Sequence, residues 1–396
     1  MSKLIFNLIN IFVVIHYAYL GGQTLPEYQN IDNIFILELS LDESKLVSKN
    51  EYKEFLLVRP IIFEVGLNND ILISDEMKIK LYSGNGDPKR ILGRPGEGPG
   101  EYRGMPYPII GPTGYIIVYD ISPLDLCYYS LYSPEYKLIY TKKFIENQPI
   151  KDYIISKGLK KNPGLFVANI TPLNETDKIY LISIIENNLN PYNDIHHYNI
   201  IYEKNKNINM NLAFNNISGL QGDGQILFDF KVIDENSLIY YTINECIFDK
   251  SKKSNYNIHI VRFDNQDNKK YTQQFIPNEI PINEKIESMK IKRIEEKIIQ
   301  QYKNALSKQK YYFPVTRILA DKEYIYIIQE NRKIDGKVHM DIFDIKASKF
   351  LMPVLIPLDQ KEIIKITNKY AYIGTLDSSG YPVLKKYKIN PAVYKK

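Results

Sequence analysis

The sequence predicts an all-β fold made of six copies of one four-stranded unit, and three observations support this. A short, almost wholly apolar run recurs six times along the 396 residues. Each run has an apolar segment before it and a more alternating segment after it. Asp75 and Asp120, at equivalent positions of the first two units, are 45 residues apart, and Gln329 and Thr375 of the last two are 46 apart, close to the period of one propeller blade, whereas the third and fourth units are longer. Together these observations predict a six-bladed β-propeller.

The recurring run is typical of a strand buried on both faces, because it combines β-branched and aromatic residues without polar alternation. Its six copies are 71–75, 115–120, 178–183, 237–242, 324–329 and 370–375. The apolar strands before them are 60–65, 107–110, 165–170, 226–230, 315–319 and 363–366. The alternating strands after them are 78–82, 125–131, 197–202, 257–263, 339–345 and 383–389. Fourth strands are expected at 89–92, 138–140, 210–214, 271–275 and 350–355.

The sixth unit has no fourth strand of its own. The N-terminal region instead carries a spare strand at 34–39, with another candidate strand at 54–58. A sheet with an unpaired edge invites aggregation, and a closed ring hides its edges. We therefore expect the N-terminal strand to join the last blade and close the ring.

The segment between the fourth and fifth units is too long for one blade and contains the one helical pattern. Apolar residues recur there at three- and four-residue steps from Asn283 to about Lys308. This pattern predicts a helix at about 283–308, inserted between blades 4 and 5. We expect the helix to pack an apolar stripe onto the propeller; the alternative is a lid over the central channel.

The N-terminus predicts a signal peptide over residues 1–22, followed by a propeller over 23–396. Lys3 supplies positive charge, 4–20 is mostly apolar, and Gly21-Gly22 offers small residues for cleavage. A membrane anchor is the alternative, but no basic cluster follows the apolar stretch. We expect a periplasmic or secreted monomer with no membrane span after cleavage. Cys127 and Cys246 both lie in apolar runs, so we expect two separate buried thiols, although export would permit a disulfide.

A net charge of +5, scattered along the chain, does not predict a nucleic-acid-binding protein, where lysine and arginine cluster on one face. The sequence contains no Gly-x-Ser-x-Gly or His-Glu-x-x-His motif. Two cysteines do not supply the four ligands of a zinc site. We accordingly assign no catalytic residue, metal ligand or cofactor.

One segment resembles a known family. Residues 91–102 read Ile-Leu-Gly-Arg-Pro-Gly-Glu-Gly-Pro-Gly-Glu-Tyr. They are similar to a Gly-x-Gly-Pro-Gly-Glu-Tyr loop that often ends the first blade of exported bacterial six-bladed β-propellers, which are related to the NHL and TolB-like groups. The strand ending at Asp75 and the turn at 83–87 precede the loop as in that family, and 312–318 and 340–344 look like its fifth blade. The motif departs at Glu97, where Gln is common, and at Asn85 in the preceding turn.

The resemblance covers essentially the whole mature chain and implies a propeller and export. It implies little about activity, because most such propellers have none assigned. The Gly93–Gly104 loop is not a phosphate loop, since it lacks Gly-Lys-Ser/Thr and no helix follows it.

The loop is the predicted ligand site, because its side chains can make charge-assisted hydrogen bonds and stack on a sugar or peptide. The residues able to contact a ligand are Arg94, Glu97, Glu101, Tyr102 and Arg103. The structural alternative is that the glycines and prolines fix a compact crossing between blades, with Arg94 and Glu101 paired or capping backbone amides.

The predicted function is an exported, non-catalytic binding or scaffold propeller for a protein or glycan partner at the cell envelope. The alternative is a metal-dependent enzyme of the lactonase or lyase type, with Asp75 and Asp120 holding a cation such as Ca²⁺ in the channel. Short polar residues at strand ends more often satisfy turn amides. The equivalent positions in the other blades are Ser183, Thr242, Gln329 and Thr375.

Overall fold

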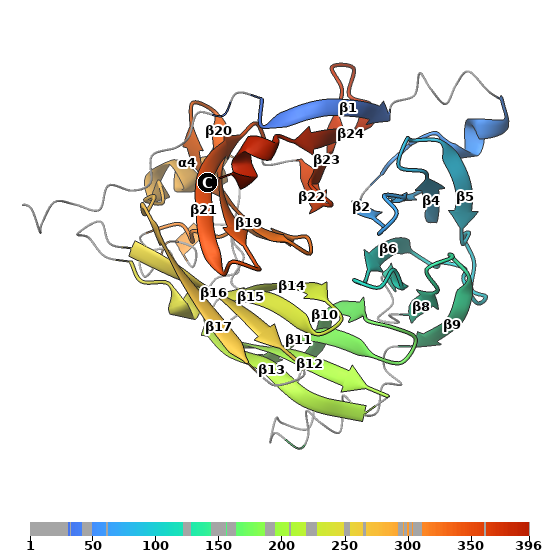
Figure 1. Cartoon of the computed structure of the whole chain (residues 1–396), viewed down its shortest axis with the longest axis horizontal. Helices are drawn as coiled ribbons and strands as arrows, with labels where there is room; N and C mark the ends of the chain where they lie inside the picture. The colour runs from blue at the N-terminus through green and yellow to red at the C-terminus, as the bar shows by residue number, and fades with distance from the viewer. Residues whose placement is uncertain are drawn as a thin grey trace, which may run out of the picture.

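The computed structural model shows six four-stranded antiparallel sheets arranged as blades around a central axis (Figure 1). It describes residues 31–395 with gaps, the longest at 42–49, 144–163, 187–194, 219–227 and 292–310, within which only scattered residues are placed. The fold is the six-bladed β-propeller that the repeats predict. All six recurring runs form the second strand of a blade, covered by strands on both sides.

In each blade the first strand faces the axis. Blade 1 contains β2 (Ile62–Val65), β3 (Ile71–Asp75), β4 (Lys78–Tyr82) and β5 (Pro88–Leu92). Blade 2 contains β6 (Met105–Ile110), β7 (Ile116–Ile121), β8 (Tyr128–Tyr132) and β9 (Leu138–Lys143). Blade 3 contains β10 (Gly164–Pro172), β11 (Lys178–Glu186), β12 (Ile195–Lys204) and β13 (Asn207–Ser218).

The second half of the ring repeats this order. Blade 4 contains β14 (Phe228–Asp234), β15 (Ser237–Thr242), β16 (Ser254–Arg262) and β17 (Asn268–Phe275). Blade 5 contains β18 (Arg317–Ala320), β19 (Tyr324–Ile334), β20 (Lys337–Asp344) and β21 (Lys349–Ile356). Blade 6 contains β22 (Ile363–Thr367), β23 (Tyr370–Leu376), β24 (Pro382–Ile389) and the N-terminal β1 (Phe35–Leu41), and a short 3₁₀ helix, η4 (Pro391–Tyr394), follows β24.

The two ends of the chain close the ring in blade 6. β1 pairs antiparallel with β24, with Phe35 opposite Ile389 and Leu41 opposite Leu384 (Figure 1). The predicted closure by the N-terminal strand is therefore confirmed. β1 is the outermost strand of the blade, and Ile36 and Leu37 on it are exposed.

The prediction of a second N-terminal strand, at 54–58, is wrong. A 3₁₀ helix, η1 (Asn50–Phe55), occupies part of that segment. The Lys80 ammonium donates to the carbonyl of Leu56, and the Tyr82 hydroxyl donates to the carbonyl of Phe55. Because side chains of β4 take up these backbone acceptors, the segment lies against blade 1 without joining a sheet.

A helix is inserted between β17 and β18, as predicted: α4 (Ile282–Ile291). Most of the remainder of the predicted span, to about Lys308, lies outside the described residues. Ile286 is buried, and a small apolar cluster forms nearby around Ile280 with Met289 and Tyr312. Figure 1 shows α4 at the rim of the propeller beside blade 5, away from the axis. This position at the rim favours the expectation that α4 packs onto the propeller over the alternative that it forms a lid above the central channel.

The predicted signal peptide and Cys127 lie outside the described residues. Cys246 is a free thiol, but it follows the 3₁₀ helix η3 (Ile243–Glu245) and does not lie in a strand. Burial raises its pKa to about 12, and the thiol lies 3.2 Å from the Tyr241 hydroxyl. It is therefore protonated and inert at neutral pH.

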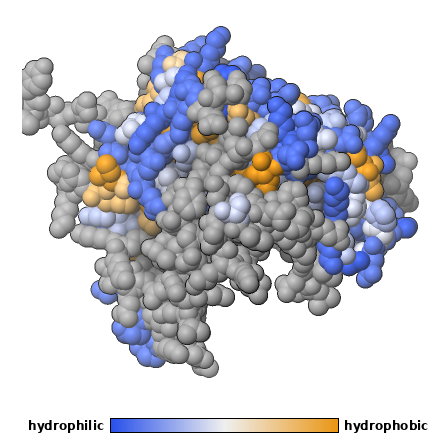
Figure 2. Space-filling model, turned by 90° about the horizontal axis from the view of Figure 1, so that it is seen from below, coloured by the Kyte–Doolittle hydropathy of each residue, from blue (hydrophilic) through white to orange (hydrophobic). Residues whose placement is uncertain are grey.

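No helix in the described part of the chain is long and apolar enough to cross a membrane. On the face shown in Figure 2, the described residues are mostly hydrophilic, and apolar residues form small separate patches. Small scattered apolar patches are normal on a protein surface and do not mark a docking site.

Candidate functional site

The Gly93–Gly104 loop connects the outer strand of blade 1 to the inner strand of blade 2. Arg94 Nε lies 2.7 Å from Glu101 Oε1, and the Gly98 amide donates to Glu101 Oε2 at 2.8 Å. The hydrogen bond from Gly98 and the Arg94 guanidinium hold the pKa of Glu101 below its usual range. Glu101 thus both pairs with Arg94 and caps a backbone amide, as the structural alternative predicts.

Tyr102 lies wholly in the core, and its hydroxyl is 3.0 Å from the Tyr132 hydroxyl. Gly93 has a φ of 69°, and a Cβ there would come within 2.2 Å of the Tyr102 ring. The glycine is therefore required both by its backbone conformation and by the close approach of the ring. Tyr102 anchors the loop and does not face solvent.

The other predicted ligand contacts remain wholly or partly accessible. The side chain of Arg94 is 77% exposed and that of Glu97 is 80% exposed. Arg103 is partly exposed, with its guanidinium 4.6 Å from the Tyr128 ring centroid and 3.5 Å from Glu97 Oε2. Ligand binding by this loop stays a prediction.

Asp75 and Asp120 hold the chain as it enters blades 1 and 2. The amides of Val58 and Arg59 donate to Asp75 at 2.9 and 2.7 Å, and those of Arg103 and Gly104 donate to Asp120 at 2.8 and 2.7 Å. Asp75 also pairs at 2.7 Å with Lys80, which is 1% exposed.

Both carboxylates therefore satisfy turn amides, the alternative that the sequence offered against a metal site. Within the described residues, no group of three or more His, Cys, Asp and Glu side chains is placed to hold a metal ion.

The inner strands of all six blades surround a central cavity of about 850 Å³. Alternate residues of a strand point to one face, so each inner strand directs about every second side chain at the axis. Six charged side chains line this channel: Glu64, Asp229, Lys231, Arg317, Glu330 and Lys365.

Four of the six charges form ion pairs. Lys365 Nζ lies 2.6 Å from Glu64 Oε1, which joins blade 6 to blade 1. Arg317 Nη2 lies 2.5 Å from Glu330 Oε1, and its Nη1 donates to the Glu362 carbonyl at 2.8 Å. Burial alone would lower the pKa of Lys365, but the Glu64 carboxylate raises it above its ordinary value. These pairs tie neighbouring strands together.

The remaining two charges lie on β14, two residues apart. Asp229 accepts hydrogen bonds from the amides of Phe230, at 2.8 Å, and Ile318, at 3.3 Å. Burial raises the pKa of Asp229 to about 6. Lys231 is half-buried, and burial lowers its pKa. Its ammonium has no hydrogen-bond or ion-pair partner among the residues that the structure describes.

Lys231, Glu64 and Lys365 line both the central cavity and a smaller cavity of about 80 Å³, and we call the part of the wall that they form the waist. The rest of the smaller cavity is lined by ends of the inner strands and by the turns that follow them, at Pro112, Lys322 and Asn368 among others. The waist therefore separates a large chamber from a small one. It carries one carboxylate and two ammonium groups.

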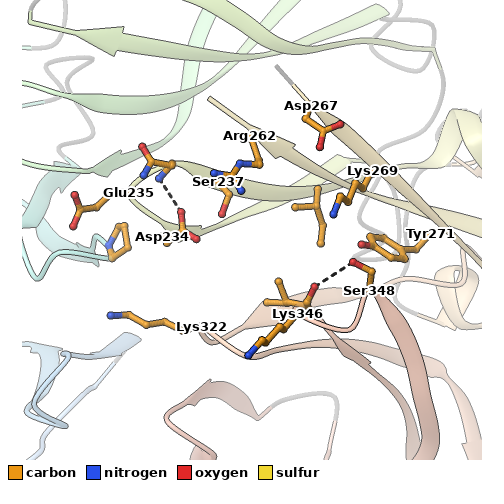
Figure 3. A pocket seen from close by; sticks show the side chains of 14 residues that line it. Asp234, Glu235, Ser237, Arg262, Asp267, Lys269, Tyr271, Lys322, Lys346 and Ser348 are labelled. Carbon is orange, nitrogen blue, oxygen red and sulfur yellow. Dashed lines mark hydrogen bonds between the residues drawn. The ribbon is translucent and has the colours of Figure 1, made fainter. Parts of the chain in front are cut away.

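A third cavity, of about 550 Å³, lies between the turns of blades 4 and 5. Figure 3 shows charged side chains from both blades around it, including Asp234, Glu235, Lys269 and Lys346. Acidic and basic groups are mixed and mostly exposed, which is typical of a solvated surface. The lysines of this groove, such as Lys269, are exposed and lie outside the channel, so they can serve as controls for Lys231.

The sequence prediction missed the channel residues. The available signal is a charged residue inside an otherwise apolar inner strand, as at Glu64, Lys231 and Lys365. Such a residue is costly in a sheet core and acceptable where the strand faces a water-filled channel.

No protein-family model matches the chain, and no curated protein sequence is similar to it. Among solved structures, the chain is similar to one described as a candidate exported protein of Bacteroides fragilis. That match has 12% identity, covers 92% of this chain and 99% of that one, and has a TM-score of 0.47. The β-propeller domain of the Trilobed protease from Pyrococcus furiosus matches with 8% identity over 81% of this chain and 80% of that one, with a TM-score of 0.37.

Proposed function

We propose that the protein is an exported, non-catalytic binding propeller that holds a polar ligand of the cell envelope, a glycan or a protein segment, in its central channel. The observation that carries this proposal is the cavity of about 850 Å³ with six charged side chains on its wall. Ligand sites in proteins are concave, have volumes of about 300–1,000 Å³, and carry a few well-placed polar groups. The apolar, basic N-terminal segment supports export.

A binding role fits the way the charges are held. Two ion pairs, Glu64–Lys365 and Arg317–Glu330, connect strands of the channel wall. These four charged groups are therefore part of the wall and already have partners. The metal-dependent alternative depended on Asp75 and Asp120, and both carboxylates accept from backbone amides. We accordingly do not propose it.

The Gly93–Gly104 loop has a secondary place in the proposal. It leads directly into β6, whose Tyr107 lines the channel. Its accessible residues Arg94, Glu97 and Arg103 would contact the outer part of the same partner, while Glu101 and Tyr102 hold the loop in shape. The double variant Arg94→Ala/Glu97→Ala should therefore weaken capture of a large partner and leave the fold intact.

The decisive experiment blocks the channel. Ile363 is half-exposed on the channel wall of β22, so Ile363→Trp should fill part of the cavity. Ile36→Trp is the matched control, because Ile36 is exposed on the outermost strand of the same blade. Because Ile363 also packs against the apolar cluster between blades 6 and 1, binding is compared per folded molecule. We expect Ile363→Trp to reduce binding in a glycan array and in capture from envelope extracts at least 10-fold, and Ile36→Trp to have no effect.

Equal binding by both variants would contradict a channel site. Turnover of a lactone or polysaccharide substrate that is lost with Ile363→Trp would contradict the non-catalytic assignment. Mass spectrometry of protein secreted by a bacterial host should also place the mature N-terminus near Gln23.

A further inference from the structure

The charges of the channel do not all find partners within the protein. Of the three cations on the cavity wall, Arg317 and Lys365 have carboxylate partners at 2.5 and 2.6 Å. Lys231 has none among the described residues. The nearest carboxylates are already engaged: Glu64 pairs with Lys365, and Asp229 accepts from two backbone amides.

An unpartnered ammonium in this position is unfavourable for the empty protein. Burial removes part of its hydration and lowers its pKa, and the Lys365 charge nearby acts in the same direction, against the attraction of Glu64 and Asp229. An anion that entered the channel would supply the missing partner in a partly desolvated site, where a charge-assisted hydrogen bond is strong. Residues that lower stability in the unbound state and have a free polar group in a cavity are typical of binding sites.

The charges at the waist favour a monoanion. Lys365 is paired with Glu64, so Lys231 is the cation left for a ligand, and a single carboxylate can pair with it. A dianion such as phosphate would be repelled by Glu64 and Asp229. The wall of the large cavity also carries uncharged hydrogen-bonding side chains, among them Asn169, Thr171 and Tyr107, and the Tyr107 ring can stack on a sugar face.

We propose that the channel binds an acidic sugar, with the carboxylate of the sugar held by the Lys231 ammonium at the waist and its hydroxyl groups in the large chamber beside Asn169, Thr171 and Tyr107. This rests on the proposed function and adds its ligand class. The large chamber has the volume of a small-ligand site, so one or two sugar rings fit within it.

The test is titration calorimetry on the mature protein with four probes: glucuronate, its neutral analogue glucose, acetate as a carboxylate without a ring, and inorganic phosphate. We expect glucuronate to bind at least 10-fold more tightly than the other three. Lys231→Met should weaken glucuronate binding at least 10-fold, and Lys231→Arg should retain most of it. Lys269→Met, in the groove of Figure 3, is the matched control and should bind glucuronate like the wild type.

A second readout separates a ligand contact from a structural lysine. Because the unpartnered ammonium is unfavourable in the empty channel, Lys231→Met should melt at a higher temperature than the wild type without ligand. A lower melting temperature would show that Lys231 supports the fold and would overturn the proposal.

The outcomes distinguish this inference from the proposed function. Binding of glucose as tight as that of glucuronate, tightest binding of phosphate, or no binding of glucuronate at 10 mM would overturn the acidic-sugar site. If Ile363→Trp still abolishes partner capture in that case, the channel function stands with a different ligand. If glucuronate binds through Lys231 while partner capture is unaffected by Ile363→Trp, the acidic-sugar site stands and the proposed envelope function is wrong.

Discussion

The Gly93–Gly104 loop and the central channel both combine basic and acidic side chains, but they use them differently. In the loop, Arg94, Glu101 and the Gly98 amide satisfy one another, and Tyr102 points into the core. In the channel, two ion pairs leave Lys231 unmatched. A conspicuous motif can therefore be a structural device, whereas a group available to a ligand can lie in an ordinary strand.

The largest expected effect is in the loop, at Gly93. Gly93→Ala would force an alanine into a φ of 69° and place its Cβ 2.2 Å from the Tyr102 ring and 2.7 Å from the Gly100 carbonyl. We expect a loss of about 3 kcal/mol or more in the free energy of unfolding, measured by urea denaturation. Gly336→Ala is the control, with a φ of 75° but no atom within 4 Å of the added Cβ, and should cost only about 1 kcal/mol.

Equal losses at the two glycines would show that the contact with Tyr102 does not matter. The loop would then not be the compact crossing described above, and its side chains would be freer to bind a ligand.

The next prediction compares the losses of stability on replacing Asp75 and Asp120, which accept hydrogen bonds from the backbone segments before blades 1 and 2. Asp75→Ala removes the acceptor of two backbone amides and leaves the buried Lys80 with only Glu76, 3.7 Å away, as a carboxylate, so we expect a loss of about 3 kcal/mol in the free energy of unfolding. Asp120→Ala removes only the amide acceptors and should cost about 1–3 kcal/mol. Chemical denaturation at pH 7 measures both. If the double variant Asp75→Ala/Lys80→Met were no more stable than Asp75→Ala, the buried ammonium would not explain the difference.

The smallest effect is a pH dependence in the channel. Asp229 has a pKa of about 6 in the folded protein, above that of an ordinary carboxyl. Folding therefore disfavours its ionised form, and its contribution to stability is most favourable at low pH and is lost as the pH rises through about 6. Between pH 4 and 7, we expect the free energy of unfolding of the wild type to fall by no more than about 1–2 kcal/mol relative to that of Asp229→Asn, because solvent in the channel screens the charge. Parallel stability curves for the two proteins would contradict the raised pKa.

The blade architecture could be predicted from the sequence because each blade repeats one local pattern. The second strands are buried on both faces and therefore lack alternation, which makes the period visible. The pairing of Arg94 with Glu101 was also predictable as an alternative, since both residues lie in one compact Gly/Pro segment.

The features that could not be predicted depend on contacts between distant segments. Residues 54–58 have strand-like side chains, but Lys80 and Tyr82 take up their backbone carbonyls. Cys246 lies in an apolar run that begins as a 3₁₀ turn. The channel waist is assembled from blades 1, 4 and 6, so that Glu64, Lys231 and Lys365 each look like an isolated charge along the chain.

The pairing of β1 with β24 also bears on the order of events during folding. Phe35 lies opposite Ile389, so the last contact of the ring joins residues from opposite ends of the chain. Contacts between residues so far apart in sequence form slowly, because most of the chain must be ordered first. The ring thus cannot close while the C-terminal strand is still being synthesised. During that interval β1 has no partner strand in the sheet of blade 6.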